Sequence, residues 1–374
     1  MKNEQLHSKI LGLVSLIGLM GLWGCSPDEA TSPTLTTVEL TSYVADYEDA
    51  TKASGPVTRA WMPPTGYSLY GEDDKVIGIA FTQDEQEPKK GNFFKSSGKW
   101  LANIDEISSD SYFLYGYIPH LSGMSMTITD RDGANANYSS GAKVTLQNVP
   151  AIMPNDLCVT IGAKQGTDKE TVTGLRMGDF SYTANGSNNY VFLLFDHLYA
   201  ALRVDMKVYG EYNKLRTIVL KSLSMKTQTG ETTSHEKTDI AIDLKATDGS
   251  DPEESPIKSI TYTPQGEVIN EPMEFWSSTG ETLTTQFSTH IGHFMPTGIT
   301  TLILTSTYDV YDKKGNLLRQ DCKATNTMVL SDLLTDQTTT RRGCRYTVKM
   351  TIHPTYLYVL SDPDLDNPTV EIDN

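Results

Sequence analysis

The chain has 374 residues, a formal net charge of −16 and 38% hydrophobic residues. This acidity excludes nucleic acid and anionic lipid heads as partners, because phosphate binding needs a basic surface. The length predicts two domains, since a single hydrophobic core stops growing at about 250–300 residues.

Residues 1–24 predict a lipoprotein signal peptide. Lys2 and Lys9 precede an apolar run, Ile10–Gly24, that is too short and too rich in glycine for a membrane-spanning helix. Cys25 follows directly, so we expect it to be the first mature residue and to carry acyl chains that hold the protein on a membrane. A plain secretory signal followed by an incidental cysteine is the alternative. No later stretch has the roughly 18 consecutive apolar residues of a membrane helix.

Residues 25–59 predict a polar tether that contains one removable strand. Leu35, Val38 and Leu40 are the apolar positions of a strand-like piece in this tether. Arg59 and Ala60 follow a flexible lead-in, and an exposed arginine of this kind is open to a trypsin-like protease. Cutting there releases both the strand and the lipid. An ordinary linker arginine is the alternative interpretation.

Residues 60–195 predict a first antiparallel β-sandwich. Val76–Phe81 and Tyr112–Tyr117 are runs typical of buried strands, and residues 124–129 alternate between apolar and polar side chains. Many short strands separated by turn residues are typical of sandwiches.

Residues 196–354 predict a second sandwich. Alternation marks strands at 202–208, 239–244, 301–311 and 346–352, with a hairpin turn at 312–316. The polar stretch Lys245–Pro256 predicts an exposed loop within this domain. Short helical segments are expected at Asp196–Ala200 and Ser331–Leu334.

Residues 355–374 predict a C-terminal strand or arm. Two β-forming pieces flank a proline-rich break, and their candidate contact residues are Tyr356, Leu357, Tyr358, Val359, Leu360, Val370 and Ile372. This tail is either an edge strand of its own domain or an extended arm for a neighbouring subunit.

The motifs of catalysis and cofactor binding are missing from the sequence, which has no nucleophile elbow, phosphate loop or His-Glu-x-x-His. His290 and His293 face opposite sides if they lie on one strand, so they predict no metal site. Asp130 and its neighbours resemble part of a calcium loop, but a polar hairpin is the better interpretation. Cys322 and Cys344 either form a disulfide or are small buried residues, the latter being favoured. We therefore expect no enzyme, no metal and no cofactor.

Several diffuse features occur together in the order seen in one family. They are Cys25, Arg59-Ala60 ahead of Trp61, Gly71–Phe81, Gly98-Lys99-Trp100, Tyr112–Pro119, Phe195-Asp196-His197 leading into Ala200–Val208, and Gly343–Ile352 followed by the tail. With these features the mature chain resembles, over nearly all its length, the fimbrillin family of lipoprotein pilins, which build type V pili of Gram-negative anaerobes.

The resemblance implies a fold, partners and a route to the cell surface. It implies two transthyretin-like sandwiches in tandem, export to the outer membrane as a lipoprotein through Cys25, and cleavage between Arg59 and Ala60 by a trypsin-like protease. It also implies that the Tyr356–Ile372 arm is donated to another pilin subunit, in a homo- or heteropolymer that supports adhesion.

Two other functions stay open at this point. One is a fimbrial anchor subunit of the same family, which keeps its lipid and starts at Cys25 instead of Ala60. The other is a surface glycan-binding lipoprotein, in which Trp61, Trp100 and Trp276 form a sugar platform.

Overall fold

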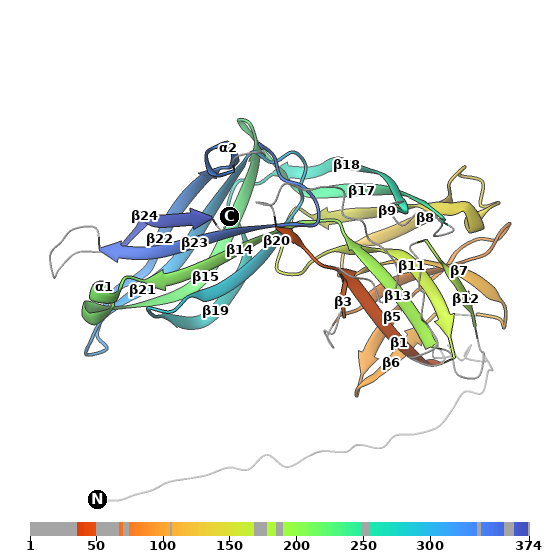
Figure 1. Ribbon diagram of the computed structural model, residues 1–374, viewed down its shortest axis with the longest axis horizontal. Coiled ribbons are helices and arrows are strands. Elements are labelled where there is room, and N and C mark those ends of the chain that lie inside the picture. Colours follow the sequence, from red (N-terminus) through yellow and green to blue (C-terminus); the bar gives the residue numbers. More distant parts are fainter. Residues whose placement is uncertain are drawn as a thin grey trace, which may run out of the picture. The chain divides into compact units, whose positions relative to one another are not determined.

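The computed structural model describes residues 36–49, 67–69, 75–104, 107–167, 178–184, 190–247, 255–334, 338–354 and 363–372. Within these ranges the chain is built almost entirely of β-strands, so the prediction of an all-β fold is confirmed (Figure 1). No helix in the described part is long and apolar enough to cross a membrane.

Sheet A has nine strands. They are β1 (Thr36–Ala45), β3 (Tyr67–Leu69), β4 (Ile77–Thr82), β5 (Lys89–Ser96), β6 (Lys99–Asn103), β7 (Ser111–Ile118), β11 (Cys158–Gly166), β12 (Ser181–Thr183) and β13 (Tyr190–His197). Their order is β11-β13-β1-β6-β5-β4-β7-β12, and β11 also pairs with β7. Strand pairing therefore forms a closed ring, and β1 is one of the strands in it.

Sheet C packs against one face of sheet A. It contains β8 (Ser125–Asp130), β9 (Gly141–Pro150), β17 (His235–Lys245) and β18 (Ile257–Val268). The shared core includes Tyr115 and Phe192 from sheet A and Val144 and Ile242 from sheet C. A separate core on the other face of sheet A includes Val38, Ile79, Phe93 and Val191. We call these two groups the cover core and the ring core.

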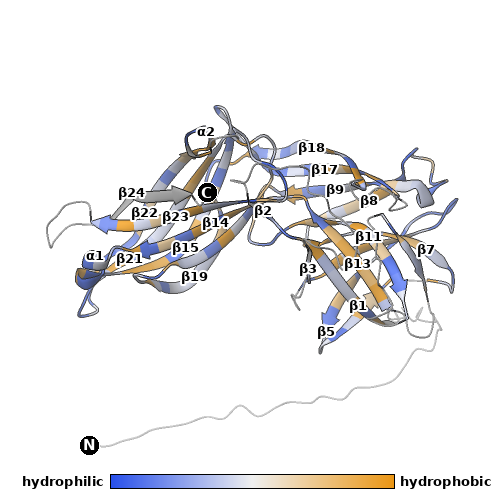
Figure 2. Ribbon diagram, in the orientation of Figure 1, coloured by the Kyte–Doolittle hydropathy of each residue, from blue (hydrophilic) through white to orange (hydrophobic). Residues whose placement is uncertain are grey.

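Sheets B and D share a third core. Sheet B contains β2 (Glu48–Asp49), β10 (Ile152–Met153), β14 (Ala200–Val208), β20 (Ser288–Phe294), β23 (Cys344–Pro354) and β24 (Pro363–Ile372). Sheet D contains β15 (Arg216–Thr229), β16 (Thr232–Thr233), β19 (Met273–Leu283), β21 (Thr301–Asp312) and β22 (Leu317–Val329). Buried and half-buried positions alternate along β23, because successive side chains of a strand point to opposite faces. Hydrophobic and hydrophilic residues both occur along the strands of these sheets (Figure 2).

Helical structure is short in the described residues: α1 (Gly210–Leu215), α2 (Leu330–Leu333) and the 3₁₀ turn Tyr138–Ser140. The helical segment expected at Asp196–Ala200 is wrong. Asp196 and His197 end β13, and β14 begins at Ala200. Hydrogen bonds to residues distant in the sequence decide this corner, since Leu198 N donates to Leu157 O at 2.7 Å and Gly343 N donates to Tyr199 O at 2.8 Å.

The β17–β18 hairpin joins two parts of the sequence. Its residues fall in the range 196–354. The stretch Lys245–Pro256, predicted as an exposed loop, separates the two strands in the sequence, and its residues 248–254 lie outside the described residues. However, β17 pairs with β9, which falls in the range 60–195, from Lys237–Pro150 to Lys245–Gly141. The alternating apolar face Ile240-Ile242-Leu244 is thereby buried in the cover core. The division of the chain after residue 195 stays a prediction.

Candidate functional site

Strand β1 lies inside sheet A with partners on both of its edges (Figure 1). It runs parallel to β13, from the pair Glu39–Tyr190 to the pair Val44–Phe195. Its other edge pairs with β6 over Thr36–Val38 and with β3 over Tyr43–Ala45. A strand in this position satisfies backbone donors and acceptors that its neighbours otherwise expose. We call the position between β13 on one side and β6 and β3 on the other the β1 slot.

The side chains of β1 reach both cores of sheet A. Val38 and Leu40 are 5% and 8% exposed and belong to the ring core. Tyr43 packs instead against the cover core. The Thr41 hydroxyl donates to the Tyr190 hydroxyl at 3.0 Å. The slot therefore holds β1 by apolar burial on two faces as well as by backbone pairing.

The chain after β1 passes from sheet A to sheet B. The Ala45 carbonyl accepts a hydrogen bond from Nε2 of His197 at 2.5 Å. The Tyr47 ring stacks on the His197 imidazole, with centroids 3.8 Å apart. Glu48 N donates to Gly343 O at 2.8 Å, and β2 runs parallel to the start of β23. Residues 36–49 thus contact strands of both sheets.

The C-terminal strand β24 lies along the same strand, β23, that β2 contacts. It pairs antiparallel with β23, with Val370 opposite Met350 and Ile372 opposite Val348. Strand β2 pairs at Cys344 and Arg345, at the other end of β23. Strand β14 fills the remaining edge of β23 through parallel pairing. The segment before Arg59 and the C-terminal segment therefore share one edge of sheet B.

The residues predicted from sequence are only partly covered by the structure. Val38 and Leu40 are buried in β1, and the backbones of Val370 and Ile372 lie in β24. The remaining predicted positions, Cys25, Leu35, Arg59, Ala60 and Tyr356–Leu360, lie outside the described residues. Their roles stay predictions.

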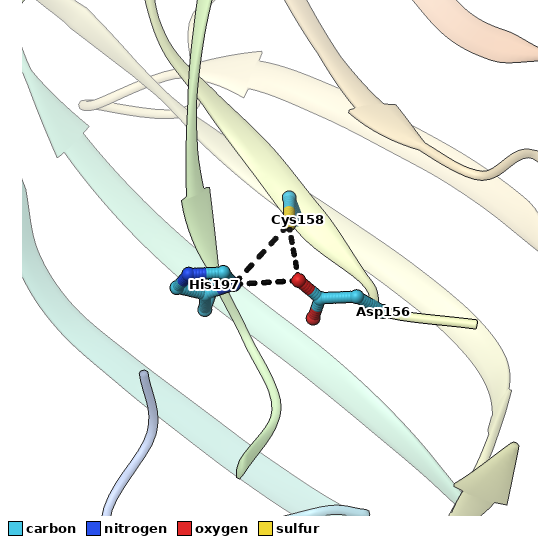
Figure 3. Close-up of side chains that lie close together, drawn as sticks. All are labelled: Asp156, Cys158 and His197. Carbon is cyan, nitrogen blue, oxygen red and sulfur yellow. Dashed lines mark hydrogen bonds and ion pairs between the residues drawn. The ribbon is translucent and has the colours of Figure 1, made fainter. Parts of the chain in front are cut away.

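A buried polar cluster lies beside the Ala45–Tyr47 segment (Figure 3). Cys158 on β11 and His197 on β13 are directly opposite each other in the strand pairing, and Asp156 precedes β11. Asp156 Oδ2 lies 2.6 Å from His197 Nδ1 and 3.3 Å from Cys158 Sγ. Cys158 Sγ lies 3.6 Å from the same imidazole nitrogen. The three polar groups converge on one point.

The hydrogen bonds of His197 define its protonation. A carbonyl oxygen only accepts, so the contact with Ala45 requires a proton on Nε2. The 2.6 Å contact between Nδ1 and the Asp156 carboxylate then needs a second proton, which the two atoms share in a hydrogen bond. Burial lowers the pKa of His197, but the charge and hydrogen bond of Asp156, the Asp196 charge and the Ala45 hydrogen bond together outweigh burial and raise this pKa overall. Likewise, burial raises the pKa of Asp156, but the charge and hydrogen bond of His197, together with His293 and Tyr47, lower this pKa overall.

This geometry does not suit nucleophilic catalysis. In a Cys–His–Asp triad the base contacts the nucleophile with one nitrogen and the orienting carboxylate with the other. Here Cys158 and Asp156 both face Nδ1, and Nε2 is bonded to Ala45. The same three side chains are, however, suitable metal ligands.

A second charged contact lies at the end of β13. Arg342 Nη1 donates to Asp196 Oδ2 at 2.8 Å and to the His197 carbonyl at 3.1 Å. Asp196 Oδ1 in turn accepts from the His197 backbone N–H. Arg342 precedes β23, so this ion pair joins the end of sheet A to the start of that strand.

His290 and His293, the two histidines considered in the sequence, contact different residues. His290 packs on Trp276 with ring centroids 4.2 Å apart, whereas His293 Nδ1 contacts the Pro154 carbonyl at 2.9 Å. Asp130, the possible calcium-loop residue, accepts backbone N–H groups from Ala134, Ala136 and Asn137. Its carboxylate therefore serves the turn that was predicted as a polar hairpin.

Sequence reasoning missed the Asp156–Cys158–His197 cluster. Asp156 and Cys158 are separated by one residue, but nothing local connects them with His197. The pairing of β11 with β13 creates the cluster. Cys322 and Cys344 are both thiols: Cys344 is buried in the core shared by sheets B and D, and Cys322 is half-buried and packs against it.

The tryptophans proposed as a sugar platform lie on different sheets. Trp100 is on β6 and packs against the ring core, whereas Trp276 is on β19 and packs against the core between sheets B and D. Trp61 lies outside the described residues. These two described rings do not form a shared platform.

Comparison with solved structures identifies similar chains from Bacteroidetes. A fimbrial protein from Bacteroides vulgatus matches with a TM-score of 0.33 and 14% identity over 90% of this chain and 98% of that one. The fimbrial anchor protein Mfa2 from Porphyromonas gingivalis matches with a TM-score of 0.24 and 9% identity over 89% of this chain and 95% of that one. A Bacteroides fragilis protein assigned provisionally to cell adhesion matches with a TM-score of 0.38 and 12% identity over 91% of this chain and 97% of that one.

No family model and no curated protein matches the sequence. The similarity to the solved structures spans nearly the whole length of each chain at low identity.

Proposed function

We propose that this protein is a shaft or tip subunit of a cell-surface fimbria that polymerises by exchanging β-strands. The position of β1 carries the proposal: a strand with partners on both edges lies ahead of Arg59, the predicted processing site. Cleavage after Arg59 separates β1 from residues 60–374 and makes the β1 slot available to another strand.

The slot provides a strong driving force for strand insertion. An empty slot exposes backbone groups of β13 and β6 together with the apolar surface that Val38 and Leu40 cover. A donor strand that buries about five apolar side chains gains on the order of 8–15 kcal/mol before ordering costs. While β1 is attached, it supplies these contacts itself. Retention of the segment therefore blocks polymerisation, and cleavage permits it.

The donor in this proposal is the C-terminal arm of a neighbouring subunit. Its residues Tyr356–Leu360 are strongly β-forming, and Val370 and Ile372 continue the apolar pattern. In the single chain, β24 pairs with its own β23, so this pairing opens before the arm reaches a second subunit. Removal of residues 25–59 also removes β2 from the same edge of β23.

The proposal includes the route to the surface. Lipidation of Cys25 holds the precursor on the outer membrane, a trypsin-like protease cuts between Arg59 and Ala60, and the released subunit joins other pilin subunits. No catalytic role and no cofactor are part of this function. The formal net charge of −16 suits an extracellular surface.

Replacement of Arg59 tests this function directly. We expect Arg59→Ala to leave full-length lipoprotein on the cell surface without polymer. Arg59→Lys is the matched control, because a trypsin-like protease also cuts after lysine, and we expect it to assemble. N-terminal sequencing of the surface protein is expected to give Ala60 in the wild type. Abundant fibres from Arg59→Ala contradict the proposal, and a mature terminus at Cys25 in fibres indicates an anchor subunit instead.

A further inference from the structure

The cluster beside the segment 45–47 has the composition of a transition-metal site. It combines a thiol, an imidazole and a carboxylate, and ligand atoms of all three lie within 4.8 Å of one another. Cys158 and His197 are fully buried, and the Asp156 side chain is 12% exposed. Zn²⁺ binds these three ligand types, whereas Ca²⁺ and Mg²⁺ prefer oxygen ligands alone.

The distances in the cluster are close to those that a tetrahedral ion requires. Zn–S and Zn–N bonds of about 2.3 and 2.05 Å place a sulfur and a nitrogen about 3.5 Å apart at the tetrahedral angle. Cys158 Sγ lies 3.6 Å from His197 Nδ1 and 3.3 Å from Asp156 Oδ2. The contact between His197 and Asp156, at 2.6 Å, has to widen by about 0.8 Å, and that between Cys158 and Asp156 by about 0.2 Å.

The outer hydrogen bond of His197 also fits a metal ligand. Imidazoles that bind a metal through one nitrogen usually donate the other N–H to a carbonyl or carboxylate, which fixes the tautomer. His197 does this with Nε2 and the Ala45 carbonyl. Its Nδ1 is thereby directed toward Cys158 and Asp156, and the Tyr47 ring covers the imidazole face.

The charges of the ligand set match a divalent ion. A Cys158 thiolate and an Asp156 carboxylate balance the two positive charges of Zn²⁺, and a neutral His197 imidazole completes the set. Protons on the sulfur or on Nδ1 leave to solvent when the ion binds. The bound ion therefore adds no uncompensated charge to the interior.

From these observations we propose that Asp156, Cys158 and His197 bind one Zn²⁺ ion, with the Ala45 carbonyl orienting His197. The ion joins the start of β11 to the end of β13, next to the β1 slot. Because Ala45 and Tyr47 precede Arg59, the bound ion and the segment 36–49 stabilise each other. The metal site itself stands independently of the polymerisation proposal.

Metal titration of the full-length, metal-stripped chain tests the site. Co²⁺ alone is the spectroscopic probe, and we expect a thiolate-to-cobalt charge-transfer band in the near ultraviolet. Zn²⁺ alone, titrated against a chromophoric chelator, is expected to bind at one ion per chain. Cys158→Ser is expected to abolish the band and to weaken Zn²⁺ binding about 100-fold.

Matched variants separate this site from the other thiols and histidines. We expect Cys25→Ser and Cys322→Ser to keep the cobalt band and to bind Zn²⁺ within about twofold of the wild-type affinity. The same is expected of His293→Gln, which leaves His197 unaltered. The wild-type cobalt band requires no variant, so a variant that fails to fold does not affect this readout. Absence of the band in the wild type, or equal Zn²⁺ affinity of wild type and Cys158→Ser, overturns the proposal.

Discussion

Tyr47 stacks on His197 with ring centroids 3.8 Å apart and an interplanar angle of 21°, and this contact links the segment ahead of Arg59 to the end of β13. The Tyr47 ring also lies 6.1 Å from the His293 ring, on β20 of sheet B. One aromatic side chain thus contacts residues of two sheets. Its removal is expected to loosen the segment 36–49 without touching the slot itself.

Tyr47→Ala is expected to lower the free energy of unfolding by about 1–2 kcal/mol, because a stacked aromatic pair and part of its buried area are lost. Chemical denaturation of the full chain measures this change. Tyr209→Ala is the matched control: Tyr209 also stacks on a histidine, His353, but it is 45% exposed and follows β14. If both variants lose the same stability and release the segment at the same rate after cleavage, Tyr47 does not hold the segment.

Leu40→Ala tests the contribution of β1 to the ring core. Truncation of a leucine that is 8% exposed is expected to cost about 2–4 kcal/mol, since it leaves a cavity beside β13. Glu39→Ala, at the exposed neighbouring position, is expected to change stability by less than about 0.5 kcal/mol. Thermal unfolding of both variants provides the comparison. Equal midpoints for the two variants are incompatible with a buried β1.

Sequence periodicity predicted strands such as β4, β7, β14 and β23 because it reports which side chains face a core. It did not predict that β1 lies parallel to β13, or that β17 pairs with β9. Pairing between distant segments depends on register and on competing partners, which local alternation does not encode. The polar cluster was missed for the same reason: the cross-strand pair Cys158–His197 exists only after β11 and β13 pair.

Asp130 is expected to make the free energy of unfolding depend on pH in the acidic range. Burial raises the pKa of Asp130, but backbone N–H donors such as Ala134 and Ala136 outweigh burial and lower it overall. A group whose pKa is depressed by folding stabilises the protein above its unfolded value of about 3.9. This contribution is lost as the pH falls through the folded value.

Asp130→Asn is therefore expected to lower the melting temperature at pH 7 and to flatten its fall between pH 5 and pH 2. Asp132→Asn, an exposed aspartate in the same turn, is the control and is expected to follow the wild-type curve. Scanning calorimetry across this pH range measures both effects. If the melting temperatures of wild type and Asp130→Asn fall in parallel across this pH range, the stabilising role of the Asp130 carboxylate is contradicted.

Zinc is expected to retain the segment after cleavage, an outcome that combines the metal site with the processing proposal. His197 Nε2 donates to Ala45 only while residues 36–49 are in place, so metal binding and segment binding favour each other. Once the chain is cut after Arg59, saturating Zn²⁺ is expected to slow release of the segment about 5–100-fold relative to a chelated sample. Cys158→Ser is expected to remove this difference. Equal release rates with and without Zn²⁺ in the wild type exclude the coupling.

Hydrogen exchange at the β13 amides that face β1, over residues 190–195, tests the removable strand most directly. We predict slow exchange in the intact chain, acceleration on the order of 100-fold after cleavage and removal of residues 25–59, and renewed protection in the polymer. Exchange at β21, in sheet D, is expected to stay constant as an internal reference. If the β13 amides remain equally protected after the segment is removed, β1 leaves no slot and strand exchange at this position is contradicted.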